Sequence, residues 1–163
     1  MKEVILEDKN KDISLDEIKL FMNEFNLKLP KGYIDFISKQ NGGYPSLSAF
    51  GNPNEDGVVI ECFYCISLNE YDYYTNEIQI LPSREIIQIH QIIEQNIPSD
   101  LYPFGYDTGG AKFCISTRDE EFGEIYMFYM DGTSEEPVYL CDSFEEFINN
   151  LEDLEIYSEE EDY

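Results

Sequence analysis

Long apolar runs are missing from this sequence. The N-terminal segment Met1–Asp8 contains no stretch of signal-peptide length, and nothing elsewhere approaches the roughly 20 apolar residues that cross a membrane. The apolar content is nevertheless 42%, including 13 tyrosines and 11 phenylalanines, which is enough to build a core at this chain length. We therefore expect a folded protein that resides in the cytoplasm.

Basic residues are scarce and unevenly distributed. Residues 1–40 carry eight acids and seven bases, whereas residues 41–163 carry 27 acids and only three bases, Arg84, Lys112 and Arg118. A field of this sign repels nucleic acid and anionic membranes and attracts basic proteins. The charge thus predicts a basic protein partner and no binding to nucleic acid or membrane, although solubility alone would explain the same acidity.

Residues that commonly carry catalysis are few. His90 is the only histidine, it stands among isoleucines, and no Ser-His-Asp or Cys-His arrangement is evident around it. Asp107-Thr108-Gly109 is the tripeptide of aspartic proteases, but that chemistry needs two carboxylates and the sequence has one copy, so a hairpin turn is the simpler interpretation. The glycine-rich pieces lack the context of phosphate loops. We expect neither enzymatic activity nor a cofactor.

Only four cysteines are present. Cys62 and Cys65 have the spacing of a metal-binding pair, but no second pair accompanies them. In a regular strand, residues three apart point to opposite faces, so we expect these two thiols to be separated. The sequence predicts buried free thiols and no metal site.

Two N-terminal helices are well marked. The capping box Ser14-Leu-Asp-Glu17 opens a helix that we expect to run to about residue 26. Pro30 suits the first position of a second helix, which residues 41–43 close because asparagine and glycine accept the left-handed conformation.

Two further helices are expected later in the chain. One opens at Ser83, places Ile86, Ile89 and Ile93 on one face and ends near residue 96. The other opens at a second capping box, Ser143–Glu146. Its apolar face consists of Phe144, Phe147, Ile148 and Leu151.

Short β-rich runs separated by turns lie between the helices. The turn-rich segment 44–57 predicts a loop, and residues 58–68 predict one or two strands. The later strands are expected at 102–104, 112–117, 124–130 and 138–141. The order α-α-β-β-α-β-β-β-β-α predicts an α+β fold, in which helices pack on a mostly antiparallel sheet of about five to six strands. We expect one domain over residues 1–151 and an acidic tail, frayed or solvated, over residues 152–163.

Two motifs resemble a known family. The first is Leu-Pro-x-x-Tyr-x-x-Phe followed four residues later by Asn-Gly-Gly, over residues 29–43, and the second is the segment 101–116, in which an aromatic-Gly-x-Asp turn and a glycine pair precede a Phe-Cys-Ile strand. Together they resemble the signature of the SUKH superfamily, the Smi/Knr-like domains, over roughly residues 14–151. The resemblance implies structural roles for Leu29, Pro30, Tyr33, Phe36, Asn41, Gly42, Gly43, Gly105, Asp107, Gly110 and Phe113.

The resemblance also implies a function. Many bacterial members are immunity proteins of polymorphic-toxin systems, which bind and neutralise a secreted toxin used in contact-dependent competition. An acidic protein fits a basic, nuclease-like toxin, because proteins that bind phosphate are commonly basic. The alternative is an intracellular scaffold or regulatory protein-binding module, a role that the superfamily has in fungi.

The contact residues are expected where acids and tyrosines alternate. Tyrosine supplies a large contact area at low entropic cost, and carboxylates pair with lysine and arginine of a basic partner. The predicted contacts are Glu70, Tyr71, Asp72, Tyr73, Tyr74 and Glu77, with a second acidic group of Asp119, Glu120 and Glu121.

Overall fold

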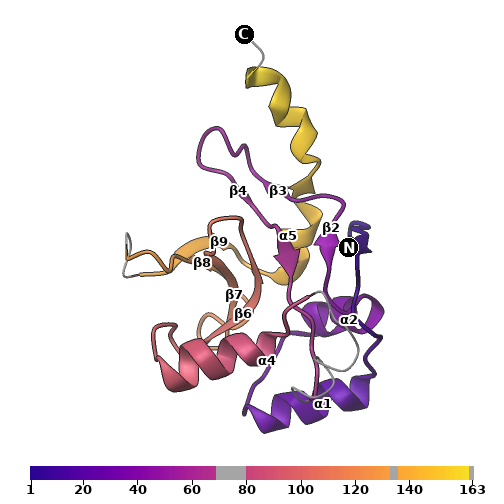
Figure 1. Ribbon diagram of the computed structural model, residues 1–163, viewed down its shortest axis with the longest axis vertical. Helices are drawn as coiled ribbons and strands as arrows, with labels where there is room; N and C mark the ends of the chain where they lie inside the picture. Colours follow the sequence, from indigo (N-terminus) through magenta and orange to yellow (C-terminus); the bar gives the residue numbers. More distant parts are fainter. Residues whose placement is uncertain (69–79, 133–135, 162–163) are drawn as a thin grey trace.

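A five-stranded antiparallel sheet forms the centre of the computed structural model, which describes residues 1–68, 80–132 and 136–161 (Figure 1). Its strands are ordered β5-β6-β7-β8-β9. They are β5 (Cys62–Phe63), β6 (Leu101–Tyr106), β7 (Lys112–Ser116), β8 (Ile125–Phe128) and β9 (Val138–Cys141). The antiparallel pairing and the packed helices confirm the predicted α+β fold.

Three helices pack on one face of this sheet. They are α1 (Leu15–Glu24), α2 (Lys31–Lys39) and α5 (Phe144–Asn149). Side chains from these helices and from β6, β7 and β8 make the main hydrophobic core. The predicted apolar face of the last helix is confirmed for Phe144, Phe147 and Ile148, which are fully buried. Leu151, which we also predicted on this face, is buried but lies beyond the helix in a short strand, Leu151–Glu152.

The remaining long helix lies at the lower end of the sheet in Figure 1 and differs from its prediction. It begins as α4 (Ser83–Ile86) and continues as the π-helical segment η1 (Ile87–Ile93). The predicted face is wrong at Ile93, which is 74% exposed, whereas Ile87 is buried. The reason is the hydrogen-bond spacing: Glu94 N donates to Ile89 O, five residues earlier, so the 3.6-residue periodicity no longer applies.

Two small sheets flank the main one. One pairs β1 (Leu6–Glu7) with β2 (Tyr44–Pro45), and the other has the order β10-β3-β4, with β3 (Ala49–Phe50), β4 (Val58–Val59) and β10 (Leu151–Glu152). The expected loop over residues 44–57 therefore contains two strands, each of two residues. β2 pairs with the distant β1, and β3 pairs both with the distant β10 and with the neighbouring β4, so the local sequence shows only one of these three pairings.

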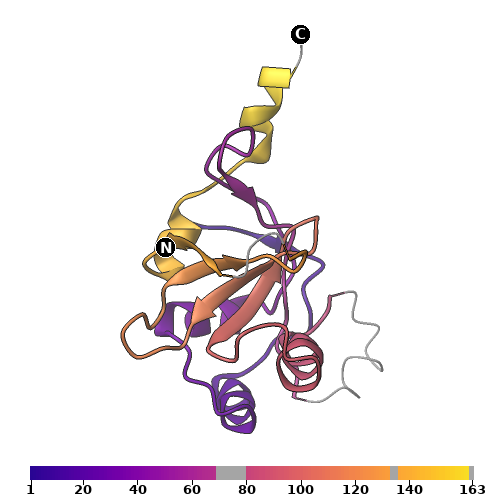
Figure 2. The ribbon, with the colours of Figure 1, turned by 90° about the vertical axis from the view of Figure 1, so that its left-hand side faces the viewer.

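For the C-terminal segment we predicted an acidic tail, frayed or solvated, and the structure describes this segment as far as residue 161. After β10 it forms a 3-10 helix, Leu154–Glu161, which rises beside the β3–β4 hairpin (Figures 1 and 2). Asn54 Nδ2 of the hairpin donates to Tyr157 O at 3.1 Å, and Tyr157 OH donates to Glu152 Oε1 at 2.8 Å. The helix is largely solvated, since Ile156 is 54% exposed.

The helix starts follow the sequence closely. Ser14 and Glu17 form the complete capping box of α1. At α5 the box is half made: Ser143 Oγ accepts from Glu146 N, but the Glu146 carboxylate accepts from Asp142 N instead of from the N-cap residue. We predicted Pro30 as the first residue of the second helix. In the structure it is the N-cap of α2 and lies one residue before the first helical residue, Lys31. Among the described residues, none of the helices has both the length and the apolar character needed to cross a bilayer.

Candidate protein-interaction surface

The outer face of the sheet carries a pair of tyrosines on neighbouring strands. Side chains alternate along β7 and β8, so Phe113 and Met127 enter the main core while Tyr126 lies on the opposite face. Tyr126 pairs in register with Tyr139 of β9, and their rings meet edge to face at 5.9 Å between centroids. Tyr139 is 50% exposed, so this pair offers aromatic surface to a partner.

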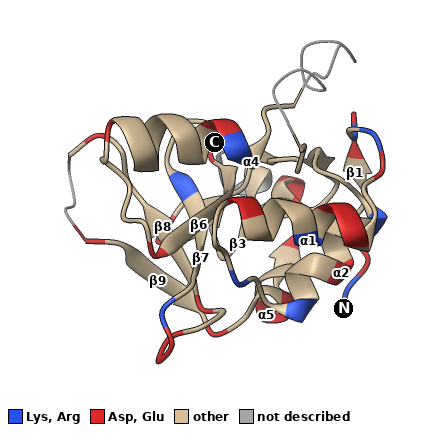
Figure 3. Cartoon of the chain, turned by 90° about the horizontal axis from the view of Figure 1, so that it is seen from below, with Lys and Arg blue, Asp and Glu red and all other residues tan. Residues whose placement is uncertain are grey.

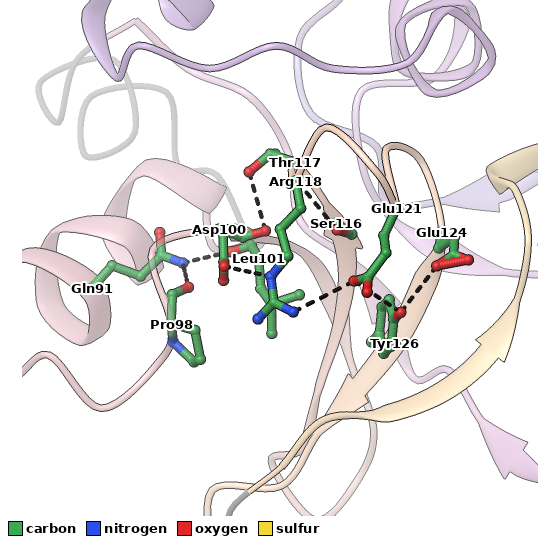
Figure 4. Close-up of polar contacts among 10 residues, drawn as sticks. All are labelled: Gln91, Pro98, Asp100, Leu101, Ser116, Thr117, Arg118, Glu121, Glu124 and Tyr126. Atoms are coloured by element: carbon green, nitrogen blue, oxygen red, sulfur yellow. Dashed lines mark hydrogen bonds and ion pairs between the residues drawn. The ribbon is translucent and has the colours of Figure 1, made fainter.

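An ion-paired cluster borders the tyrosine pair (Figure 4). Arg118 Nε lies 2.5 Å from Asp100 Oδ2, and Arg118 Nη1 lies 3.5 Å from Glu121 Oε2. Tyr126 OH donates to Glu124 Oε1 at 3.0 Å and to Glu121 Oε2 at 3.3 Å. The cluster therefore joins the acidic loop after β7 to the aromatic face of β8.

These contacts keep both tyrosines protonated. Partial burial, followed by the hydrogen bond to Glu124, raises the pKa of Tyr126 to about 12. The hydrogen bond to the Asp142 carboxylate raises the pKa of Tyr139 above its usual value. The face presents neutral phenols beside carboxylates over the whole physiological pH range.

The three bases beyond residue 40 are all engaged within the protein. Arg84 is 3% exposed, and Arg118 is paired as described above. Lys112 Nζ donates to Tyr64 OH at 2.9 Å and lies 5.8 Å from the ring centroid of Tyr106, and desolvation lowers its pKa. In Figure 3 most Lys and Arg residues lie around α1, α2 and the N-terminus, while acids occur throughout. The acidic field beyond residue 40 is thus little offset by free basic charge.

The structure places only part of the predicted contact set. Asp119 and Glu120 are exposed, and Glu121 is half-buried in the cluster of Figure 4. The contacts predicted within residues 70–77 lie outside the described residues. The sequence analysis did not single out Tyr126 and Tyr139. The turn residues Asp131-Gly132 between their strands indicate a hairpin, and a hairpin would have predicted that the two tyrosines lie on the same face of the sheet.

The tyrosine and the asparagine of the first family motif form buried hydrogen bonds. Tyr33 OH and Tyr102 OH share a hydrogen bond of 2.8 Å, and Tyr102 OH donates to Ser83 Oγ at 2.9 Å, which ties α2, β6 and α4 together. Asn41 accepts from Ile66 N through Oδ1 and donates to Ile66 O through Nδ2. These buried bonds hold irregular backbone beside the sheet.

Glycine is required at residue 42. Its φ is +81°, and a Cβ there would lie 2.8 Å from the backbone nitrogen of Cys65. In the same motif, Leu29 and Phe36 are buried. The segment thus acts through packing and close backbone approach.

The second motif contains a hairpin turn at Asp107-Thr108-Gly109, as we predicted from the single copy of this tripeptide. Asp107 Oδ1 accepts from Gly109 N at 3.0 Å and from Ala111 N at 2.8 Å, and Gly110 has a φ of +93°. Phe113 follows, fully buried. His90 is partly exposed and pairs with Glu94 at 3.3 Å, next to the helix end.

The cysteines are buried free thiols, as predicted, but the predicted separation of Cys62 and Cys65 is wrong. Both lie in one small cluster with Ile80, because β5 ends one residue after Cys62 and strand alternation ends with it. Within the described parts of the chain, no three His, Cys, Asp or Glu side chains are grouped as metal ligands would be.

Burial of these thiols predicts alkaline destabilisation. Desolvation raises the pKa of Cys62 to about 11, and the pKa values of Cys65 and Cys141 to about 12. The unfolded chain ionises first, near pH 9, so it binds fewer protons than the native state and stability falls as pH rises from about 9 toward 12. Each buried thiol contributes up to about 1.4 kcal/mol per pH unit. We expect urea midpoints to be flat from pH 7 to 8 and to drop steeply above 9, with a shallower drop in Cys62→Ala; an unchanged midpoint at pH 10.5 would contradict this.

The fold and the surface first define a class: an α+β domain with an antiparallel sheet, helices packed around it and an acidic, tyrosine-bearing outer face. The chain belongs to the SMI1 / KNR4 family (SUKH-1), whose sequence model matches residues 12–150. The superfamily includes immunity proteins, and its domains are known as immunity or binding modules. A search of curated proteins gave no match.

Proposed function

We propose that this protein is an immunity protein of a bacterial polymorphic-toxin system, which binds a basic, nuclease-like toxin domain in the cytoplasm and blocks its active site or substrate approach. The observation that carries the proposal is a SUKH-1 domain in a chain whose residues 41–163 hold 27 acids and three bases, the bases being engaged internally. A basic toxin would be attracted by that field and held by tyrosine contacts. Neutralisation is stoichiometric and involves no catalysis.

The test is co-expression with the product of a toxin gene encoded beside this one. Growth rescue and an equimolar complex by light scattering are the expected results. Absence of rescue overturns the proposal. Recovery of host proteins in place of the toxin identifies the scaffold or regulatory role.

Association with the toxin is expected to depend strongly on salt. Acids attract a basic partner over about 10 Å at 0.1 M salt, and higher salt screens that attraction, so the association rate should fall as salt rises while dissociation changes little.

Substitutions in the proposed contact segment, residues 70–77, give a more specific test of where the toxin binds. Reversing the charge of Glu70 and Asp72 should slow association, and Tyr73→Ala should mainly speed dissociation, both measured by surface plasmon resonance. Unchanged rates in all these variants would place the contact elsewhere.

A further inference from the structure

Two strand edges face a common groove. β9 is the last strand of the main sheet and β4 is the last strand of the small sheet, so among the described residues each pairs on one side only. A groove of about 480 Å³ runs between them, with Val58 on one wall and Val138, Tyr139 and Leu140 on the other. In Figure 1 the β3–β4 hairpin stands above β9.

The edge of β9 is only partly protected against pairing. Natural edge strands are commonly blocked by a charge, a proline or a bulge on the strand itself. β9 carries one bulge at Leu140, because Tyr139 and Cys141 pair with the consecutive residues Tyr126 and Ile125 of β8. Its sequence Val-Tyr-Leu-Cys contains neither charge nor proline, and Val138 and Tyr139, which precede the bulge, are 43% and 50% exposed. An extended segment could therefore add to this edge through its backbone and place side chains against Val138 and Tyr139.

The opposite wall, formed by the β3–β4 hairpin, is held in place by close backbone approach and by packing on the core. The hairpin turns back at Gly51 and Gly57, where a Cβ on Gly57 would lie 2.4 Å from the carbonyl carbon of Gly51. Phe50 anchors the wall to the core, with its ring stacked on Phe147 at 5.3 Å. The C-terminal 3-10 helix braces the hairpin from outside through Asn54. The groove is thus a formed feature between two supported walls.

The charge of the groove selects its occupant. Glu55 and Asp56 are exposed on its rim, and no base is found among the described residues that line it. A second copy of the chain would bring its own Glu55, Asp56 and net charge of −25 against the same acids. Like charges oppose that pairing, whereas lysine or arginine side chains on an extended segment would be attracted.

We propose that the groove between β4 and β9 binds an extended, basic segment of the protein partner by strand addition to β9. The identity of that partner as a toxin rests on the proposed function, but the strand-addition site does not. A basic residue on the segment would pair with Glu55 or Asp56, while the backbone completes the sheet edge.

The probe is a capped octapeptide of alternating lysine and valine, titrated into the labelled protein and followed by NMR. We expect amide shifts concentrated at Val58 and Val138–Leu140, with slower amide exchange along β9. Replacing lysine by glutamate should weaken binding at least about tenfold. N-methylation of one of the two alternate sets of peptide amides should do the same, because it removes donors needed for strand pairing. Equal binding of both N-methylated peptides, or shifts spread evenly over the acidic surface, overturns the proposal.

A matched pair of variants separates local contact from general attraction. Glu55→Lys with Asp56→Lys changes the groove rim, and Asp12→Lys with Glu94→Lys makes the same change in net charge at exposed residues that do not line the groove. We expect at least a tenfold loss of peptide affinity for the first pair and less than a threefold loss for the second. Equal losses of peptide affinity, or dimers seen by light scattering, overturn the basic segment as the occupant.

The two proposals can fail separately. If the peptide binds the groove but no toxin is neutralised, only the proposed function fails. If a toxin is neutralised equally by the rim variant and no peptide binds, only the groove proposal fails.

Discussion

Phe113→Ala is expected to lower the free energy of unfolding by about 3–5 kcal/mol, one of the largest effects of any single substitution in this chain. Phe113 is fully buried, and its ring lies 5.5 Å from that of Phe147 and 6.2 Å from that of Phe104. Alanine would remove this ring from between β7 and α5 and leave a cavity that a closely packed core fills only in part.

Phe36→Ala tests the same core from the helix side. Its ring lies 5.2 Å from the rings of both Phe63 and Phe144, and we expect a loss of similar size. Phe122 is the matched control, because it is 42% exposed and its truncation should cost less than about 1 kcal/mol. Urea denaturation with a common slope measures all three. Near-neutral values for Phe36 and Phe113 would remove both from the core.

Arg84→Ala is expected to lower the free energy of unfolding by about 3 kcal/mol. The guanidinium is buried over the ring of Phe25, pairs with Glu24 and donates to the carbonyls of Ser67 and Leu68. Removing the guanidinium takes this donor away from both carbonyls, which is costly where water has little access. Arg84→Lys should recover only part of the loss, because an ammonium cannot reproduce the planar fork.

Arg118→Ala is the matched control. Its side chain is 47% exposed and those of its partners Asp100 and Glu121 are 39% and 38% exposed, so water replaces the lost ion pairs and the expected cost is below about 1 kcal/mol. Thermal unfolding at low and high salt adds a second readout: the small Arg118 effect should vanish at high salt, whereas the Arg84 effect should persist. Equal effects of the two substitutions would contradict the assignment of Arg84 as a buried tie.

Local patterns predicted the parts of the fold that local physics determines. The Ser14 capping box, the Asp107 turn and the apolar face of α5 each depend on residues within a few positions of one another, and the structure confirms all three. The alternation of β7 also held, because Lys112 and Phe113 occupy opposite faces.

The remaining features depend on partners far away in the sequence. β3 pairs with the distant β10 as well as with its neighbour β4, and Cys65 joins Cys62 because the sheet pattern ends at Phe63. The groove between β4 and β9 is formed by strands some 80 residues apart, so no sequence window contains both walls. The acidic character of the surface could be predicted, but its shape could not.

The pairing of β3 with β10 also bears on when the fold of a newly made chain can close. Residues 49–50 must wait for residues 151–152, about 100 positions later, before the small sheet closes. The main core likewise takes Val4 from one end of the chain and Leu151 from the other. The core to which α1 and α2 contribute therefore closes only after residue 151 has been made, so folding of a newly made chain depends on contacts between segments far apart in the sequence.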